Sequence, residues 1–291
     1  MHRIAPAATR AELETLLRDD VPHGDLTTSA LGLGARPARM SFVARDAMVA
    51  ALVEDAATIL EIAGAIVDVQ ARSGDTLAPG APILTARGPA AAILQGWKVA
   101  QTLIEIWSGV ATSARAIVDA ARAVSPEIMV ACTRKNTPGT KRFAVAAVRA
   151  GGAIMHRLGL SETVLVFPEH LALTQEPDLA AISARLRIAA PEKKLVIEVK
   201  TVEQGLAAAQ AGFDVIQGEK FAPTDIAELA ACLARLTRAP LVAAAGGINA
   251  ANAAAYARAG AGALVTSAPY AAPPRDVAVT IESAGAEQRL G

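Results

Sequence analysis

The fold class follows from residues 195–219, LVIEVKTVEQGLAAAQAGFDVIQGE. Two apolar runs with the character of strands, at 195–199 and 215–217, flank a helical segment at 202–211. A strand, a crossover helix and a second strand form the repeating unit of a parallel sheet covered by helices. The same alternation continues along the chain on both sides of this stretch, from Ala111 onward.

The strands of this alternation are expected at 128–132, 153–155, 164–167, 195–199, 215–217, 241–244 and 263–266. No GxGxxG motif follows the first of them, which argues against an open dinucleotide-binding sheet. The pattern therefore predicts an α/β barrel, and barrels place their chemistry at the C-terminal ends of the strands.

The first third of the chain has a different, mixed α+β character. Thr9 and Glu12 have the spacing of a capping box, which predicts a helix through Arg18. Strands are expected at 38–49, 65–70 and 83–87, and a helix at 50–63 that ends at Gly64. A longer helix follows, because one apolar stripe runs through Ile93, Trp97, Ala100, Ile104 and Trp107. Lys98 falls off this stripe, as a solvated lysine would.

Composition narrows the possible functions. The 291 residues include 28 Lys or Arg and 28 Asp or Glu, so the chain lacks the basic excess that nucleic-acid binding requires. No segment approaches the roughly 18 uncharged apolar residues of a membrane span, and Glu12 and Glu14 interrupt any signal-peptide core. The two cysteines, Cys132 and Cys232, lie far apart in the sequence and form no CxxC motif. We therefore expect reduced thiols in a cytoplasmic protein, with a disulfide between them as the alternative. No paired metal spacing, and hence no zinc, is expected of the histidines, which are His2, His23, His156 and His170.

Basic residues follow the first two strands of the expected barrel. Arg134 and Lys135 begin the loop at 133–142, TRKNTPGTKR, and His156 and Arg157 follow the second strand. Arginine binds phosphate or carboxylate with two hydrogen bonds, and lysine adds a point charge, so these loops fit an anionic ligand. A solvated basic loop and a buried structural histidine are the alternatives.

Acidic residues follow two later strands. Glu198 and Glu219 lie near the ends of neighbouring strands, where two carboxylates can hold Mg²⁺, usually through water, or bind sugar hydroxyls. The alternative is a rim salt bridge from Glu198 to Lys200 or Lys220.

A glycine-containing loop follows a late strand. Residues 243–249, AAAGGIN, lead into a helix expected to begin near Asn249, and barrels commonly bind phosphate at such a loop and helix N-terminus. Gly246 and Gly247 would let the backbone approach the phosphate, and Ser267 could form the opposite wall. Phosphate loop, carboxylates and cations together suit a sugar phosphate that carries a pyrophosphate, with an anionic acceptor.

Four motifs make a resemblance visible: DVPHGDLTT at 20–28, SGVAT at 108–112, TRKNTPG at 133–139 and GGAIMHRLGL at 151–160. With them the chain resembles the quinolinate phosphoribosyltransferase (nicotinate-nucleotide pyrophosphorylase) family, most closely its ModD branch, which is linked to molybdenum transport. The resemblance implies an N-terminal α/β open-faced sandwich (1–110), an incomplete α/β barrel of about seven strands (111–270), and a C-terminal tail that returns to the first domain (271–291). It also implies a homodimer whose sites each borrow a residue from the partner.

The reaction implied by the resemblance transfers 5-phosphoribosyl from 5-phosphoribosyl 1-diphosphate (PRPP) to a nitrogen base, uses Mg²⁺ and releases pyrophosphate. Lys135, Glu198 and Glu219 would be catalytic, and the two glutamates would hold the ribose hydroxyls and Mg²⁺. The residues that would bind substrate are Lys98, Arg134, Lys135, His156, Arg157, Phe167, Gly246, Gly247 and Ser267. Among these, Arg134, His156 and Arg157 would contact the acceptor's carboxylates, and Lys98 would act across the subunit interface.

The sequence departs from the family pattern mainly at residues expected to bind the acceptor. Lys98 stands where the family has arginine, Trp97 replaces an acid, Glu219 replaces a more frequent aspartate, and Phe167 replaces a lysine that meets the substrate's anionic groups. The ribose and pyrophosphate machinery is thus expected to be retained while the acceptor pocket is rebuilt. Two other functions stay open: a non-catalytic anion-binding or metabolite-binding protein associated with molybdate transport, and an aldolase-like barrel with a Schiff-base lysine at Lys200 or Lys220.

Overall fold

The computed structural model of the protein describes residues 6–284 and divides into two compact units. Of the described residues, the first contains 6–115, 137–152 and 269–284, and the second contains 116–136 and 153–268. His2 and the last part of the expected tail, 285–291, lie outside the described residues. Within residues 6–284, no helix is both long and apolar enough to cross a lipid bilayer.

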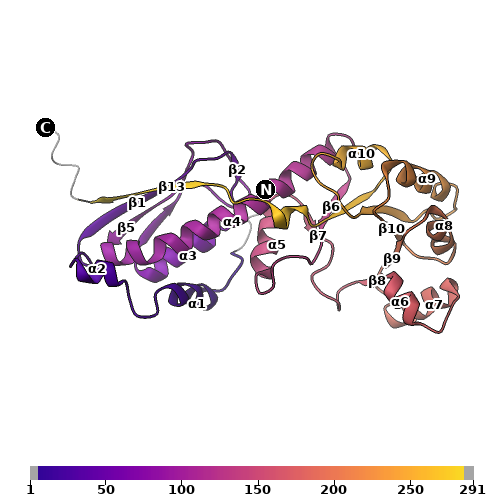
Figure 1. Cartoon of the computed structure of the whole chain (residues 1–291), viewed down its shortest axis with the longest axis horizontal. Coiled ribbons are helices and arrows are strands. Elements are labelled where there is room, and N and C mark those ends of the chain that lie inside the picture. Colours follow the sequence, from indigo (N-terminus) through magenta and orange to yellow (C-terminus); the bar gives the residue numbers. More distant parts are fainter. Residues whose placement is uncertain (1–5, 285–291) are drawn as a thin grey trace. The chain divides into compact units, whose positions relative to one another are not determined.

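The first unit contains an antiparallel sheet with the strand order β13-β1-β5-β3. Its strands and the small β2–β4 pair are β1 (Pro37–Ala44), β2 (Met48–Val49), β3 (Ile66–Val69), β4 (Thr76–Leu77), β5 (Pro82–Pro89) and β13 (Val277–Ser283). Its helices are α1 (Arg10–Asp20), α2 (Leu26–Ala30), α3 (Val53–Ala63), most of α4 (Ala90–Arg122) and α5 (Lys141–Ala150). Figure 1 shows the yellow β13 beside β1, and the two strands pair from Ala38↔Ser283 to Ala44↔Val277. The last described strand of the chain thus completes a sheet that begins with the first.

Local signals in this unit are confirmed with one correction. Thr9 forms the predicted capping box with Glu12, and α3 ends at Gly64, whose φ of 104° is left-handed. The strand predicted at 38–49 is wrong, because β1 ends at Ala44 and β2 pairs with β4 instead of continuing in the sheet. The chain bends where Arg45 meets Asp276 just before β13, through a backbone hydrogen bond of 2.9 Å and a side-chain pair at 3.2 Å.

The second unit is a seven-stranded parallel sheet with the order β7-β6-β12-β11-β10-β9-β8. Its strands are β6 (Met129–Cys132), β7 (Ile154–Met155), β8 (Val164–Val166), β9 (Leu195–Val199), β10 (Val215–Glu219), β11 (Leu241–Ala245) and β12 (Ala263–Thr266). Between them lie α6 (Pro168–Leu173), α7 (Leu179–Ala189), α8 (Val202–Gln210), α9 (Pro223–Leu233) and α10 (Ala253–Arg258). The short helix η1 (Ala268–Ala271) begins at the last residue of this unit, and its other residues belong to the first unit. Because β7 and β8 are the two edges and do not pair, the barrel is incomplete, as predicted.

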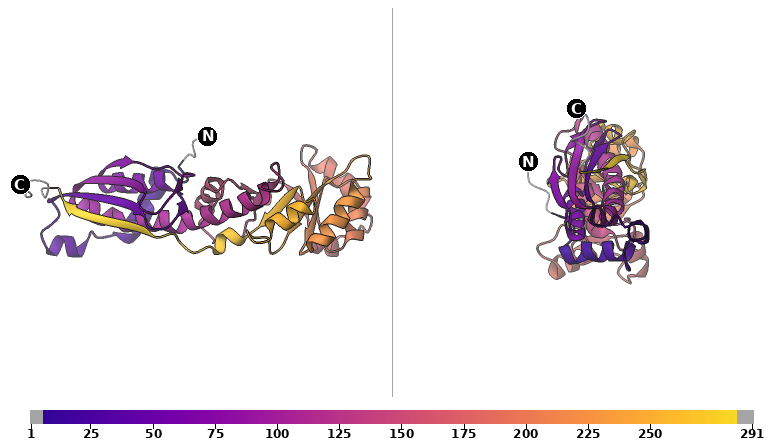
Figure 2. Two further views of the ribbon diagram at one scale, coloured as in Figure 1. Left: turned by 90° about the horizontal axis from the view of Figure 1, so that it is seen from above. Right: turned by 90° about the vertical axis from the view of Figure 1, so that its left-hand side faces the viewer.

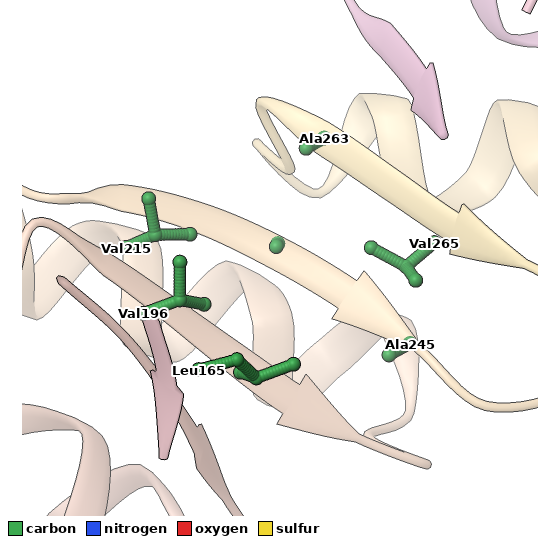
Figure 3. Close-up of a cluster of buried hydrophobic side chains, with 7 residues drawn as sticks. Leu165, Val196, Val215, Ala245, Ala263 and Val265 are labelled. Atoms are coloured by element: carbon green, nitrogen blue, oxygen red, sulfur yellow. The ribbon is translucent and has the colours of Figure 1, made fainter. Parts of the chain in front are cut away.

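Alternate residues of these strands point into the barrel and build its core. Figure 3 shows the cluster that includes Leu165, Val196, Val215 and Val265, gathered over one face of the strands. Helices α7, α8 and α9 pack against β9, β10 and β11, and Figure 2 shows the orange helices beside these strands. Small and β-branched side chains fill this narrow interior.

Candidate active site

A cavity of about 600 Å³ opens within the second unit, at the C-terminal ends of the barrel strands. All of the predicted site residues except Lys98 line it: Arg134, Lys135, His156, Arg157, Phe167, Glu198, Glu219, Gly246, Gly247 and Ser267. These residues come from loops and strand ends that are far apart in the sequence. The parallel arrangement brings them together, because all C-terminal strand ends meet at the same side of the sheet.

Acidic and amide side chains occupy the wall formed by β9 and β10. Val196 and Val215 are paired in the interior core, and two residues further along both strands the paired positions hold Glu198 and Gln217. Alternation along a strand therefore turns Glu198 and Gln217 inward, and Glu219 comes one step closer to the mouth. The interior changes from apolar to polar over a single pair of residues.

Glu198 lies in a site that disfavours its charge. Burial raises the pKa of Glu198 and nearby Glu219 raises it further, while the hydrogen bond from Gln217 acts in the opposite direction. Gln217 Nε2 donates to Glu198 Oε2 at 2.9 Å. Gln217 is only 4% exposed, and its Oε1 receives no hydrogen bond from any described residue.

Cationic side chains occupy the opposite part of the cavity, where β6 and β7 end. The backbone N–H of His156 donates to the Cys132 carbonyl at 2.9 Å, which joins the two strand ends. Arg157 is 8% exposed, and no described carboxylate lies within ion-pair distance of it. Burial and the neighbouring Arg134 lower the pKa of Arg157, and burial together with Arg157 lowers the pKa of His156, which leaves the imidazole neutral near pH 7.

An aromatic pair lies next to these cations. Phe167 was predicted to end a strand but caps α6, and its backbone N–H donates to His170 Nδ1 at 2.9 Å. The two rings stack with centroids 5.8 Å apart. The Arg157 guanidinium lies over the face of Phe167, 5.5 Å from the ring centroid, at a distance typical of a cation–π contact.

The loop after β11 contains the predicted glycines but not the predicted helix terminus. Gly246 and Gly247 have φ values of 86° and 78°, which side chains with a Cβ rarely adopt. The helix expected to begin near Asn249 begins at Ala253, because the Asn252 side chain holds a turn: its Oδ1 accepts from Asn249 N–H at 2.8 Å and its Nδ2 donates to the Gly247 carbonyl at 3.0 Å. An anion at this loop would therefore be held by the glycine backbone and not by a helix dipole.

Lys98 lies on the α4 segment of the first unit. Its ammonium lies 3.9 Å from the centroid of the Trp97 ring and donates to Gln101 Oε1 at 2.8 Å. It lines a separate hollow of about 350 Å³, together with Asp19 and Asp20. Its implied role across a subunit interface stays a prediction.

Four further polar residues line the cavity without having been predicted as site residues: Thr133, Glu169, Gln217 and Lys220. Inward alternation after Val215 could have found Gln217, since position 217 faces the same side of the strand. Lys220 was considered only as a rim salt-bridge partner of Glu198 or as a Schiff-base lysine. Lys200, the other lysine considered for that role, is absent from the described lining.

Comparison with known proteins matches two family profiles to successive parts of the chain. The profile of the quinolinate phosphoribosyl transferase N-terminal domain matches residues 25–108, and the profile of the C-terminal domain matches residues 110–280. The chain belongs to the quinolinate phosphoribosyltransferase family. It is 52% identical over 248 residues to the ModD protein of Rhodobacter capsulatus, a pyrophosphorylase by name, in a match that covers 85% of this chain and 95% of that protein.

More distant members of the quinolinate phosphoribosyltransferase family carry another name. A protein of Methanothermobacter thermautotrophicus, named as a carboxylating nicotinate-nucleotide pyrophosphorylase, is 32% identical over 250 residues, covering 85% of this chain and 89% of that protein. The solved structure of NadC from Streptococcus pyogenes has a TM-score of 0.87 at 24% identity and covers 97% of this chain and 99% of that one. This likeness confirms the fold of an N-terminal antiparallel sheet unit and a seven-stranded half-barrel.

The Mg²⁺ implied by the family resemblance fits the residues of the acidic wall. Among the described residues, no three His, Cys, Asp or Glu side chains gather closely enough to hold a metal ion alone. Mg²⁺ commonly binds through one or two carboxylates, water and substrate phosphates, and does not need a complete protein cage. Glu198 and Glu219 repel each other, so a cation between them would relieve the unfavourable charge of Glu198.

Proposed function

We propose that this protein is a phosphoribosyltransferase that moves the 5-phosphoribosyl group of PRPP to a nitrogen atom of an anionic acceptor and releases pyrophosphate. The observation that carries this proposal is the buried Arg157, which has no described carboxylate partner and faces a cavity whose other wall is acidic. A buried charge without a counter-ion is costly, so a ligand that brings an anion to this position would gain much of its affinity there.

The transfer breaks the bond between ribose C1 and the diphosphate oxygen, and its electron pair leaves with the pyrophosphate. Positive charge develops on the ribose ring, where Glu198 and Glu219 would accept hydrogen bonds from the hydroxyls and stabilise that charge. Lys135 would offset the negative charge of the leaving group. Glu198 and Glu219 would hold Mg²⁺, which would supply further positive charge for the diphosphate.

The acceptor completes the reaction when the lone pair of its nitrogen forms the new bond to C1. Arg134 and Arg157 would hold its carboxylate and so orient the nitrogen toward the ribose. Neutral His156 would donate a hydrogen bond without adding charge. Phe167 provides an apolar face against which an aromatic acceptor ring can pack.

Two measurements test this function. Calorimetry with PRPP and Mg²⁺ measures binding of the donor, and a pyrophosphate-release assay with pyridine and purine carboxylic acids measures transfer. If the protein is a transferase, Glu198→Ala is expected to lose most of the turnover while its melting temperature stays nearly unchanged. The control is Glu203→Ala, which alters an exposed glutamate on α8 and is expected to change neither the turnover nor the melting temperature. Near-normal turnover of Glu198→Ala would remove Glu198 from the mechanism.

The second candidate function is a non-catalytic anion-binding protein that serves molybdate transport. Phe167 is the observation that favours it, because an uncharged ring stands where the resemblance places a cation for the substrate. Binding of PRPP without pyrophosphate release for any acceptor would support this candidate and contradict the transferase.

We also propose that the active form is a cytoplasmic homodimer in which Lys98 completes the site of the partner subunit. Mixing of two inactive variants, Lys98→Ala and Glu198→Ala, tests this arrangement. In mixed dimers one site carries both changes and the other carries neither, so activity returns on mixing. No recovery in a mixture shown to exchange subunits would contradict a shared site.

A further inference from the structure

Lys220 has a backbone conformation that its residue type disfavours. Its φ is 58°, and among residues 6–284 only Leu52 shares a positive φ without being glycine. The left-handed region costs conformational free energy for any residue with a Cβ, and such residues cluster at functional sites. Leu52 is fully buried, so core packing offsets its cost, but the side chain of Lys220 is exposed. Burial therefore gives no reason for lysine at position 220.

The turn at Lys220 is held firmly by its neighbours. The backbone N–H of Lys220 donates to the Ala245 carbonyl at 2.7 Å, and the next residue, Phe221, is buried. Tyr256 Oη donates to the Phe221 carbonyl at 2.9 Å. These contacts hold the backbone of the turn and involve no atom of the Lys220 side chain, and glycine or asparagine would be less strained at this position.

The side chain of Lys220 extends along the phosphate-loop candidate. A Cβ added to Gly246 would lie 2.7 Å from Lys220 Cγ, so the aliphatic stem of the lysine packs directly on the glycine backbone. Lys220 lines the same cavity as Gly247 and Ser267, and no described residue forms an ion pair or hydrogen bond with its ammonium group. No described residue accepts a hydrogen bond from the backbone N–H groups of Gly246 and Gly247.

We propose that Lys220 is a phosphate-binding residue, whose ammonium group binds the 5′-phosphate of the phosphoribosyl donor at the Gly246–Gly247 loop. The inference rests on the proposed function for the identity of the donor, and it assigns that donor's 5′-phosphate to one more protein group. A lysine ammonium next to free backbone N–H groups is a recurrent arrangement for phosphate. The contact with Gly246 favours the 5′-phosphate over the diphosphate, which lies on the other side of the ribose.

Substitution by glycine separates this role from a structural one. Lys220→Gly removes the ammonium and also relieves the backbone strain, so the melting temperature stays the same or rises. Binding of ribose 5-phosphate, measured by calorimetry, weakens about 10- to 100-fold, as expected for loss of a charged hydrogen bond. Binding of inorganic pyrophosphate changes less than about threefold. Lys220→Asn, which also tolerates the left-handed conformation, behaves in the same way.

The matched control is Lys194→Ala, since Lys194 is exposed at the opposite end of β9 and outside the cavity. This variant binds both probes as the unaltered protein does. An affinity for ribose 5-phosphate that stays within about twofold in Lys220→Gly would overturn the inference, as would a loss confined to pyrophosphate. Both probes are measured without an acceptor, so weaker binding of ribose 5-phosphate by Lys220→Gly supports a phosphate-binding role of Lys220 even if no transferase activity is found. Conversely, a Lys220→Gly variant that is active and binds ribose 5-phosphate with unchanged affinity refutes the role of Lys220 and leaves the proposed function intact.

Discussion

Gln217 donates its side-chain amide to Glu198 across 2.9 Å, from the paired position on the neighbouring parallel strand. The donor group holds one carboxylate oxygen in place although burial and Glu219 both disfavour its charge. The other end of the amide, Oε1, receives no hydrogen bond from any described residue. Burying Gln217 Oε1 without a hydrogen bond costs free energy of folding, whereas the amide at the other end of the side chain fixes the position of Glu198. Gln217 therefore serves the placement of Glu198 at a cost in the stability of the unliganded fold.

Gln217→Met removes the hydrogen bond and keeps a similar side-chain volume. We expect kcat to fall about tenfold or more, because a hydrogen bond to a charged group is worth about 1.5–3 kcal/mol, while the melting temperature stays level or rises. Steady-state kinetics and thermal unfolding measure the two effects. Gln210→Met, on the exposed end of α8, is the control. A lower melting temperature with unchanged kcat would show that Gln217 is structural only.

Arg157→Met tests whether the buried cation serves a ligand. Removing an unpaired buried charge is expected to raise the melting temperature, whereas affinity for a carboxylate acceptor falls at least about tenfold. Arg157→Lys keeps the charge but cannot bind a carboxylate through two parallel hydrogen bonds. Its KM for the acceptor is therefore expected to lie between those of the unaltered protein and Arg157→Met. If Arg157→Met destabilised the fold and left the acceptor KM unchanged, the guanidinium would be structural.

Phe167→Lys tests the class of acceptor. The new ammonium would offer a partner to a second carboxylate, so the ratio of kcat/KM for a pyridine dicarboxylate to that for a pyridine monocarboxylate is expected to rise about tenfold or more. Phe167→Leu separates the charge from loss of the ring, which also removes the contact with Arg157. A ratio that moves equally in both variants would assign the preference to the ring.

Asp214 stabilises the barrel at the end away from the cavity, where it accepts hydrogen bonds from Leu195 N–H at 2.8 Å, Arg187 at 3.1 Å and Arg238 at 2.9 Å. Burial alone would raise the pKa of Asp214, but these partners outweigh it and bring the pKa below its ordinary value of 3.8. A pKa that is lower in the folded state gives stability that is fully present above the ordinary value and is lost as the pH falls from that value through the pKa of the folded state.

Asp214→Asn should therefore unfold more easily than the unaltered protein at neutral pH, by about 1–3 kcal/mol. The difference in free energy of unfolding shrinks as the pH falls below about 4. Denaturant titrations at several pH values measure it, with unchanged acceptor KM as evidence that the site is intact. A difference that stays constant down to acidic pH would contradict the assigned ionisation.

The order of strands and helices could be predicted because it depends on local patterns. Leu195–Val199 and Ala263–Thr266 were predicted with their observed bounds, since short apolar runs between helical segments mark buried parallel strands. Two failures have different causes. The predicted strand ends early because the distant Asp276 contacts the chain after Ala44, whereas the helix expected near Asn249 begins late because the nearby Asn252 side chain holds a local turn.

The chemical types gathered at the strand ends were visible in the amino-acid order, because parallel strands bring their C-terminal ends to one side. The contacts between residues of different segments could not be predicted from the amino-acid order. The pairing of Gln217 with Glu198, the seat of Arg157 over Phe167 and the left-handed turn at Lys220 each depend on register and packing between segments that lie far apart along the chain. Hydrophobic periodicity is a local property of the chain, whereas those relations arise only when the strands assemble and the side chains compete for one shared interior.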